Sequence, residues 1–387
     1  MPLIINVFLR ELRFILGNKS YLFLFLVWPL FDGLVLAGIY ADKVVTRMPI
    51  AIVDNDHSAL SRALVRYIDS SRSFTVTGHV STVHDLEDLM YRRKIAIGVY
   101  IPRELERDVK RGASGVITSY IDGSNYLIAN LAQADLRTMV STIGAGMRLK
   151  YLQKTGNSRD KALAQVMPIK TDLTKLYNPG YNYVNYLAPG LWAAILQQVM
   201  MLFGALMIAG ERDKKTFGEL MSCAGNSAFA AAAGKIALYV TLSLALFEIT
   251  FRVMFPLFDI PIKGSAPVMS AYTVLFILAS ISMGFLLSTA MKTRINAIKA
   301  TLLISAPAFI LCGYTWPISS MPAFIKPVAM AIPLTVYVSG YRKLYQQGAG
   351  AGAVINEALI LAAMTAVFFT AGIWLMRRTI RNSVGQR

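Results

Sequence analysis

The segment GERDKKTFGELM, residues 210–221, places six charged side chains in twelve positions of a strongly apolar chain. It follows one long apolar run, 186–208, and precedes another, 236–255. From Glu211 onward the pattern is that of a short helix, with charges at its start and apolar side chains behind them. The segment therefore predicts a polar connector between two membrane-spanning helices.

The composition of the whole chain agrees with this prediction. Of the 387 residues, 55% are hydrophobic and 16% are charged, and the mean hydropathy is +0.50, which is too apolar for a water-soluble core. Six apolar runs approach or exceed the roughly 20 residues that a spanning helix needs. They are 21–41, 186–208, 236–255, 271–291, 297–314 and 354–376. We expect an α-helical membrane protein with six transmembrane helices.

The N-terminal segment 1–41 is expected to hold an interfacial helix followed by the first span. Helical spacing places Ile5, Phe8, Leu12 and Ile15 on one face and Asn6, Arg10 and Arg13 on the other. Arg10, Glu11 and Arg13 interrupt the apolar core that a cleavable signal peptide would need.

Lysine and arginine gather in alternate connections between the spans, which predicts cytoplasmic N- and C-termini. The basic residues placed inside are Arg10, Arg13, Lys19, Arg212, Lys214, Lys215, Lys235, Lys292, Arg294, Lys299, Arg377, Arg378, Arg381 and Arg387. The short outer loops hold Lys263, Lys326, Arg342 and Lys343. The net charge of +17 is explained by topology and by attraction to anionic membrane lipid, and the chain shows no pattern typical of nucleic-acid binding.

Charge returns between residues 42 and 182, a block of ordinary domain size between the first two spans. The sequences PIAIVD, SFTVTGHV, KIAIGVYIP and SGVITSYID predict strands, and helical patterns separate or follow them, including a long one at 125–154. The alternation favours an inserted α/β domain. Because the N-terminus is predicted to be cytoplasmic, the domain that follows the first span is expected to be extracytoplasmic.

Residues 183–387 are expected to hold spans two to six. Tyr177, Tyr181, Tyr183 and Tyr186 lie where the second span begins, as in an aromatic belt at the outer interface. A later segment, 315–345, is apolar but interrupted by Pro317, Pro322, Pro327 and Pro333, so we expect short re-entrant or interfacial helices there.

The sequence offers no catalytic, cofactor or metal site. The only Gly-Lys pair, Gly234-Lys235, is followed by isoleucine and has Phe229 where a phosphate loop needs glycine, so ATP binding by that route is excluded. The three histidines lack zinc-binding spacing, and the two cysteines offer no disulfide framework. The triplet Asp54-Asn55-Asp56 follows a predicted strand, and Asp56 or Ser58 is interpreted as the N-cap of the helix that comes next.

Three ionisable residues fall within predicted spans and mark a candidate intramembrane polar site: Asp32, Glu248 and Arg252. Glu248 and Arg252 are four residues apart, so an internal ion pair is one explanation. Asp32 either faces a polar cavity or reaches interfacial water at the outer end of its span.

The connector resembles that of type-2 ATP-binding-cassette (ABC) transporter permeases, and its matching residues are Glu211, Arg212, Thr216, Glu219 and Leu220. It departs at Lys215, where the family usually has glycine, and at Phe217. The stretches IAIVDNDHSALS, IGVYIPRELERDVKRG, YNPGYNYVNYLAPG and the SSMP segment resemble the subgroup with a large periplasmic domain between spans one and two.

The resemblance implies a coupling helix near 211–222 that docks on a separate ABC ATPase, with Glu211, Arg212, Lys215, Thr216, Glu219 and Leu220 as coupling residues. ATP and Mg²⁺ would then bind in that partner, and this chain would be a transport subunit and not an enzyme. The family pairs two permeases, as a homodimer or a heterodimer, and exports drug-like or lipid-like amphipathic molecules from the inner membrane. Some members work with a periplasmic adaptor and an outer-membrane duct.

Two other classes fit the composition. An ion-coupled secondary transporter could use Asp32 or Glu248 as a proton site, and a non-transporting receptor or scaffold could be built around the inserted domain. The first predicts transport by the purified chain in a proton gradient. The second predicts ligand binding without stimulation of any ATPase.

Overall fold

The structure is a computed structural model that describes residues 2–40, 42, 44–169 and 174–384. Ala41, at the end of the first predicted span, and Arg387, in the predicted inner set of basic residues, lie outside the described residues. The chain divides into two compact units, one formed by 1–43 with 175–387 and the other by 44–174. The second unit is inserted between the first two apolar helices of the first.

Six helical segments in the described part of the chain are long and apolar enough to span a membrane, which confirms that prediction. The first is formed by α2 (Lys19–Leu22), η1 (Phe23–Val27) and α3 (Trp28–Ile39), and the second is α9 (Tyr183–Asp213). The third runs through α11 (Ala228–Ile249), η2 (Thr250–Met254) and α12 (Phe255–Leu257). The others are α13 (Ala266–Ala290), α14 (Arg294–Leu311) and α17 (Ile355–Val384), the last preceded by η4 (Ala351–Val354).

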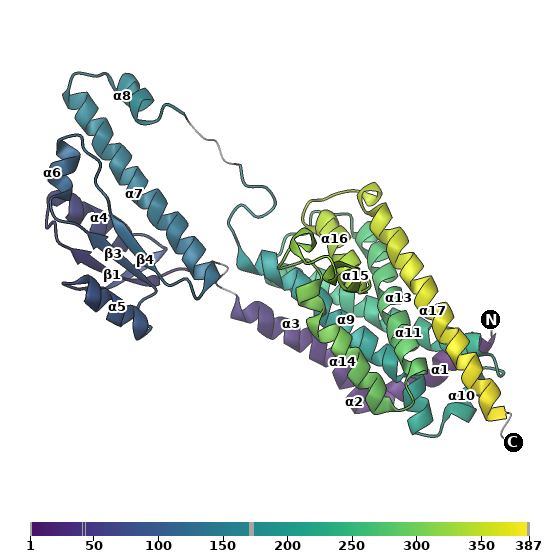
Figure 1. Ribbon diagram of the computed structural model, residues 1–387. Coiled ribbons are helices and arrows are strands. Elements are labelled where there is room, and N and C mark those ends of the chain that lie inside the picture. The colour runs from purple at the N-terminus through teal and green to yellow at the C-terminus, as the bar shows by residue number, and fades with distance from the viewer. Residues whose placement is uncertain (1, 41, 43, 170–173, 385–387) are drawn as a thin grey trace. The chain divides into compact units, whose positions relative to one another are not determined.

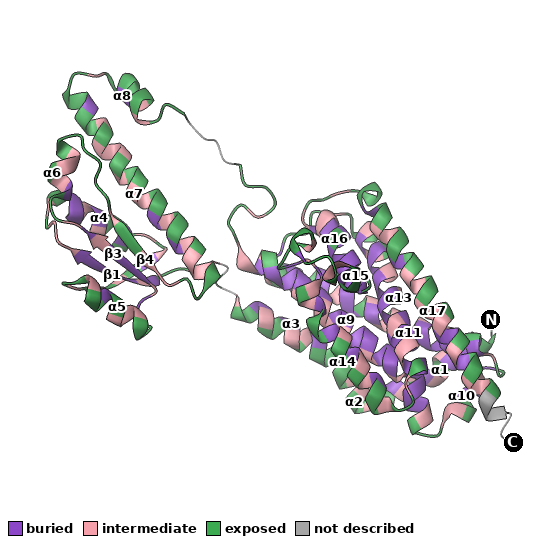
Figure 2. Ribbon diagram, in the orientation of Figure 1, coloured by how far each residue is buried: buried purple, intermediate pink, exposed green. Residues whose placement is uncertain are grey.

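Helices α9 and α13 form the centre of this unit, and most of their residues are buried (Figure 2). They cross where Gly204 and Gly284 meet. A Cβ atom added to Gly284 would lie 2.3 Å from the carbonyl oxygen of Met201, and one added to Gly204 would lie 2.6 Å from that of Ile281. The two glycines therefore allow a backbone approach that no larger residue permits.

The proline-rich segment forms short helices in place of a continuous span: η3 (Ile318–Ser320), α15 (Ile325–Met330) and α16 (Pro333–Tyr345). Helix α16 is largely buried. Its Tyr337 stacks on Phe276 of α13 with ring centroids 4.0 Å apart, and its Leu334 N–H donates to the buried Gln197 side chain of α9 at 2.7 Å. Pro317 and Pro333 thus stand where η3 and α16 begin and interrupt a continuous span, while aromatic packing holds the pieces together.

The inserted unit contains the four predicted strands, β1 (Met48–Asp54), β2 (Phe74–His79), β3 (Ile97–Ile101) and β4 (Thr118–Ile121). They form one sheet in the order β2-β1-β3-β4, in which β1 runs parallel to β2 and β3, and β4 is antiparallel to β3. Its helices are α4 (Ala59–Asp69), α5 (Val83–Tyr91), α6 (Leu105–Lys110), α7 (Tyr126–Lys154) and α8 (Arg159–Val166).

The acidic triplet of the inserted unit is used locally. Asp54 accepts hydrogen bonds from the backbone N–H groups of Asp56 and His57, and Asp56 accepts one from Glu106. Ser58 caps α4 through the N–H of Ser61 at 3.0 Å. Of the two predicted capping residues, Ser58 is therefore the N-cap of α4, and Asp56 is not.

The N-terminal helix α1 (Pro2–Leu16) buries most of the predicted apolar face, since Ile15 is buried and Phe8 and Leu12 pack, partly buried, against the core. Its buried stripe is Val7, Glu11 and Ile15, whereas Ile5 is 51% exposed. The prediction was wrong at Ile5 because an acidic residue, Glu11, occupies the centre of the buried stripe. The side chains that bind Glu11 lie far from it in the sequence.

Candidate coupling site

The connector consists of two helical pieces joined by a tight turn. Helix α9 continues through Glu211 and Arg212 and ends at Asp213, and the separate helix α10 (Phe217–Cys223) follows. The predicted single coupling helix is therefore interrupted. The break lies at Lys215, whose φ of +61° places it in the left-handed region.

A buried ion network fixes this turn to two other helices. Lys235 of α11 contacts Glu11 of α1 and Glu211 of α9, with each Nζ–Oε distance 2.7 Å. Arg10 donates two hydrogen bonds to the Glu211 carboxylate, at 2.8 and 3.0 Å. The side chains of Glu11 and Lys235 are each 3% exposed and that of Glu211 is 9% exposed, so these three are shielded from solvent, whereas Arg10 is 26% exposed.

Hydroxyl groups complete the network. Tyr239 donates to Glu11 at 2.8 Å, and Thr216 donates to Glu211 at 2.5 Å. The hydrogen bond to Glu211 raises the pKa of Arg10 above its usual value, so its guanidinium group stays charged. Two carboxylates and two cations thus balance one another, as burial of charge requires. We call Arg10, Glu11, Glu211 and Lys235 the ionic brace.

The backbone brings these groups together by close packing of α1 on α11. A Cβ atom on Gly234 would lie 2.6 Å from the Cβ of Val7 and 2.7 Å from the carbonyl oxygen of Ile4. The glycine next to Lys235 therefore lets α1 approach closely enough for Glu11 to reach the ammonium group. Gly234, within α11, therefore serves helix packing.

Arg212 fixes the same end of α9 to two more helices. It donates to the carbonyl oxygen of Met291 at 3.2 Å, after α13, and to the Thr379 hydroxyl of α17 at 3.4 Å. Leu220 of α10 is fully buried among apolar side chains. Leu220 thus packs α10 on the apolar core, and Arg212 fixes the end of α9 to α17. Figure 1 shows α1, α10 and the last turns of α17 at one end of the unit.

The six predicted coupling residues therefore fall into two groups. Glu211, Arg212, Thr216 and Leu220 face inward and hold the connector. Lys215 and Glu219 face outward, and the Glu219 side chain is 73% exposed, 3.9 Å from Arg10. Only these two of the six are exposed charged side chains.

The sequence did not single out Glu11, Lys235 and Tyr239 as members of this site. Lys235 interrupts a run of alanine and other apolar residues, and Glu11 lies four residues from each of Val7 and Ile15. Those two charges within apolar stripes are the signal that could have identified them.

We expect Lys215→Gly to stabilise the connector by about 0.5–1 kcal/mol, because glycine adopts the left-handed conformation without steric conflict. Thermal unfolding of the purified chain measures the effect. Lys214→Gly is the comparison and should destabilise the chain, because Lys214 has a φ of −81°, gains nothing from glycine and loses the contact of its Nζ with the Phe14 ring, 4.0 Å from the centroid. Equal effects of the two substitutions would show that the backbone conformation of Lys215 is not strained.

The candidate intramembrane residues are not brought together into one site. Glu248 binds Arg252 at 2.7 Å and also accepts a hydrogen bond from Ser270 of α13. Asp32 is half-exposed on α3, and none of the described residues forms an ion pair with it. No group of metal-ligating side chains occurs in the described ranges.

Six candidate spans and a polar connector braced between them define the class of this chain, a multi-pass membrane protein with a rigid connector at one end. The model of the family described as "ABC-2 family transporter protein" matches residues 19–374. The chain belongs to this family and is a permease of the ABC-2 type, a multi-pass protein of the inner membrane.

The relatives have similar lengths throughout. "Inner membrane transport permease YhhJ" of Escherichia coli (strain K12) is 24% identical over 383 residues, which cover 97% of each chain. "Probable multidrug ABC transporter permease YbhR" of the same organism is 22% identical over 357 residues, 92% of this chain and 93% of the relative. "Probable multidrug ABC transporter permease YbhS" is 24% identical over 374 residues, 95% and 94% of the two chains.

Proposed function

We propose that this chain is the membrane-spanning permease of an ATP-driven exporter of amphipathic or hydrophobic small molecules, drug-like or lipid-like. A separate ABC ATPase, which binds ATP and Mg²⁺, drives it through the outward surface of α10. The word "multidrug" in the names of two relatives supports drug-like substrates. The family supports an ATPase partner and pairing with a second permease, identical or different.

The observation that carries the proposal is the ionic brace. Closure of an ATPase can move the spans only if the segment that it pushes transmits force without bending. Helix α10 is short, and its turn is fixed by Arg10 and Lys235 through Glu211 and by Arg212 through α17. A force applied at Glu219 would therefore be transmitted to α1, α9, α11 and α17 together.

The proposed arrangement places the connector and both termini in the cytoplasm and the inserted unit in the periplasm. The basic residues at the connector end support this orientation. In the subgroup that the sequence resembles, the periplasmic domain is large, and an adaptor protein and an outer-membrane duct are further proposed partners. Short helices α15 and α16 would then form the re-entrant segment at the outer face.

Glu219→Arg is expected to reduce copurification of the ATPase at least about tenfold, because it reverses the charge on the outward surface. It also replaces the 3.9 Å contact with Arg10 by a repulsion between two cations, so the stability of the variant has to be measured beside the copurification. The assay is affinity purification of the complex from membranes, with thermal unfolding of the permease as the check on folding. Glu211 does not serve this purpose, since it is buried and its reversal would disrupt the brace itself.

The control for Glu219→Arg is the same charge reversal at a glutamate outside the connector. Glu357→Arg is unsuitable for this purpose because Glu357 forms an ion pair with Lys343. Glu87→Arg is suitable because Glu87 is exposed in the inserted unit, and it should leave copurification unchanged. Full retention of the ATPase by the Glu219→Arg variant would remove Glu219 from the coupling surface.

A further inference from the structure

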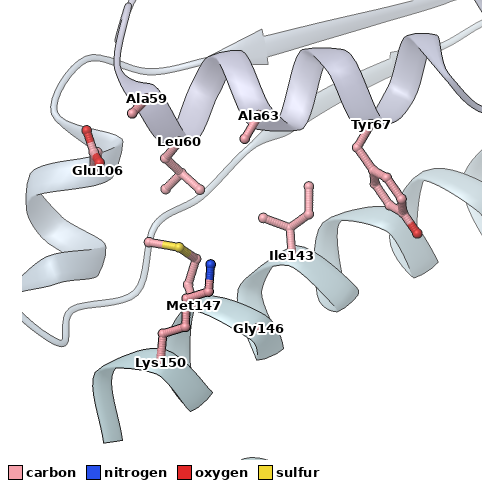
Figure 3. Close-up of a pocket in the computed structure, with 9 residues that line it drawn as sticks. All are labelled: Ala59, Leu60, Ala63, Tyr67, Glu106, Ile143, Gly146, Met147 and Lys150. Atoms are coloured by element: carbon pink, nitrogen blue, oxygen red, sulfur yellow. The ribbon is translucent and has the colours of Figure 1, made fainter. Parts of the chain in front are cut away.

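The inserted unit contains a groove between α4 and α7 that the proposed function does not use. Its volume is about 460 Å³, within the range of small-molecule sites. Figure 3 shows Ile143, Met147 and Lys150 rising from α7 toward α4, with Tyr67 at one end and Glu106 at the other.

The groove exists because α7 leaves part of the domain core uncovered. Ile143 and Met147 pack against the core but are only partly buried, and Leu60 lies opposite them on α4. Between them α7 has Gly146, where an added Cβ atom would find no heavy atom within 4 Å. The floor of the groove is thus apolar and open, and burial of an apolar ligand there would extend the core.

The charge around the groove is positive. Lys150 lines it and also lines an adjoining cavity of about 430 Å³, together with Lys154, Lys110 and Tyr151. The groove's one carboxylate, Glu106, is paired with Lys110 at 2.9 Å. In the described ranges neither Lys150 nor Lys154 forms an ion pair. The ammonium groups of Lys150 and Lys154 are therefore available to bind an anionic ligand.

We infer that this groove binds a small amphipathic organic anion, with its apolar body on Leu60, Ile143 and Met147 and its anionic group at Lys150. A cationic amphiphile would be repelled by the unpaired lysines, and an uncharged one would gain nothing from them. The inference does not depend on the proposed function, because binding to the groove requires neither nucleotide nor an ATPase.

The test uses the full chain in lipid nanodiscs with ¹³C-labelled methionine methyl groups and follows the Met147 signal by NMR. The probes are octane-1-sulfonate, octyltrimethylammonium and octyl glucoside, which share the alkyl chain and differ in charge. We expect a saturable shift of the Met147 signal with the sulfonate and at least about tenfold weaker binding of the other two. Replacement of Met147 assigns the signal.

Two pairs of variants separate a site from general attraction to the surface. Gly146→Leu should abolish the shift by filling the groove, whereas Gly144→Leu should preserve it, since Gly144 also has open space around its Cβ position but does not line the groove. Lys150→Gln should weaken sulfonate binding about tenfold, and Lys161→Gln on α8 should not. Both leucine variants should raise the helix propensity of α7, so loss of folding is not expected.

Equal shifts from the sulfonate and the ammonium probe would overturn the inference. So would sulfonate binding that survives Gly146→Leu. Absence of a saturable shift with any probe would also overturn it and would leave the groove as a surface for a protein partner.

Discussion

Replacement of Lys235 by methionine is expected to destabilise the chain by about 3–5 kcal/mol, because it leaves the carboxylates of Glu11 and Glu211 buried without their shared cation. Arg10 contacts only Glu211 within the brace, and Glu11 would keep only the hydrogen bond from Tyr239. Thermal or denaturant unfolding of the purified chain measures the loss. ATPase copurification should fall as well, since the turn before α10 loses its support.

Two further variants make this prediction specific. Lys292→Met, at an exposed lysine after α13, should leave the stability unchanged. The double variant Lys235→Met with Glu11→Gln should recover much of the loss, because a neutral amide replaces the unpaired carboxylate. If Lys235→Met unfolds like the unmodified chain, the brace does not stabilise the connector.

Gly284→Leu is expected to disrupt the centre of the membrane unit and to remove at least about 3 kcal/mol of stability. The new side chain would start 2.3 Å from the carbonyl oxygen of Met201 and 3.0 Å from the amide nitrogen of Ala205, so α9 and α13 would have to separate. Their separation would expose apolar side chains along both helices. The expected readouts are a lower unfolding temperature and a smaller yield of monodisperse protein in detergent.

Gly38→Leu is the matched control, because Gly38 lies on α3 with no heavy atom within 4 Å of an added Cβ atom. It should leave the unfolding temperature within the error of the measurement. Loss of stability in both variants to the same extent would attribute the effect to leucine itself and not to the helix crossing.

Local patterns predicted much of this fold. Short runs rich in apolar and β-branched residues identified the four strands, and the prolines in 315–345 correctly predicted short helices. The length and composition of the apolar runs predicted the six candidate spans. Each of these features is decided by neighbours within one element, so its signal lies in a short window of sequence.

The ionic brace could not be predicted in the same way. Glu11 and Lys235 are 224 positions apart, and nothing in either local segment shows that the two side chains meet. Glu11 also made the buried face of α1 hard to predict, because a stripe of Val7, Glu11 and Ile15 does not show the apolar pattern of a buried helix face. The connector resembled a coupling helix as a whole, but which of its charges face inward depends on α1 and α11, which the connector sequence does not contain.

The central claim is that this chain is moved by a separate ATPase and has no energy source of its own. The most direct measurement is uphill transport of an amphipathic fluorescent dye in proteoliposomes, with the chain alone or with its ATPase, and with ATP and Mg²⁺ or a proton gradient. We predict dye accumulation only when the ATPase, ATP and Mg²⁺ are all present. Uphill accumulation by the purified chain alone in a proton gradient would contradict the claim.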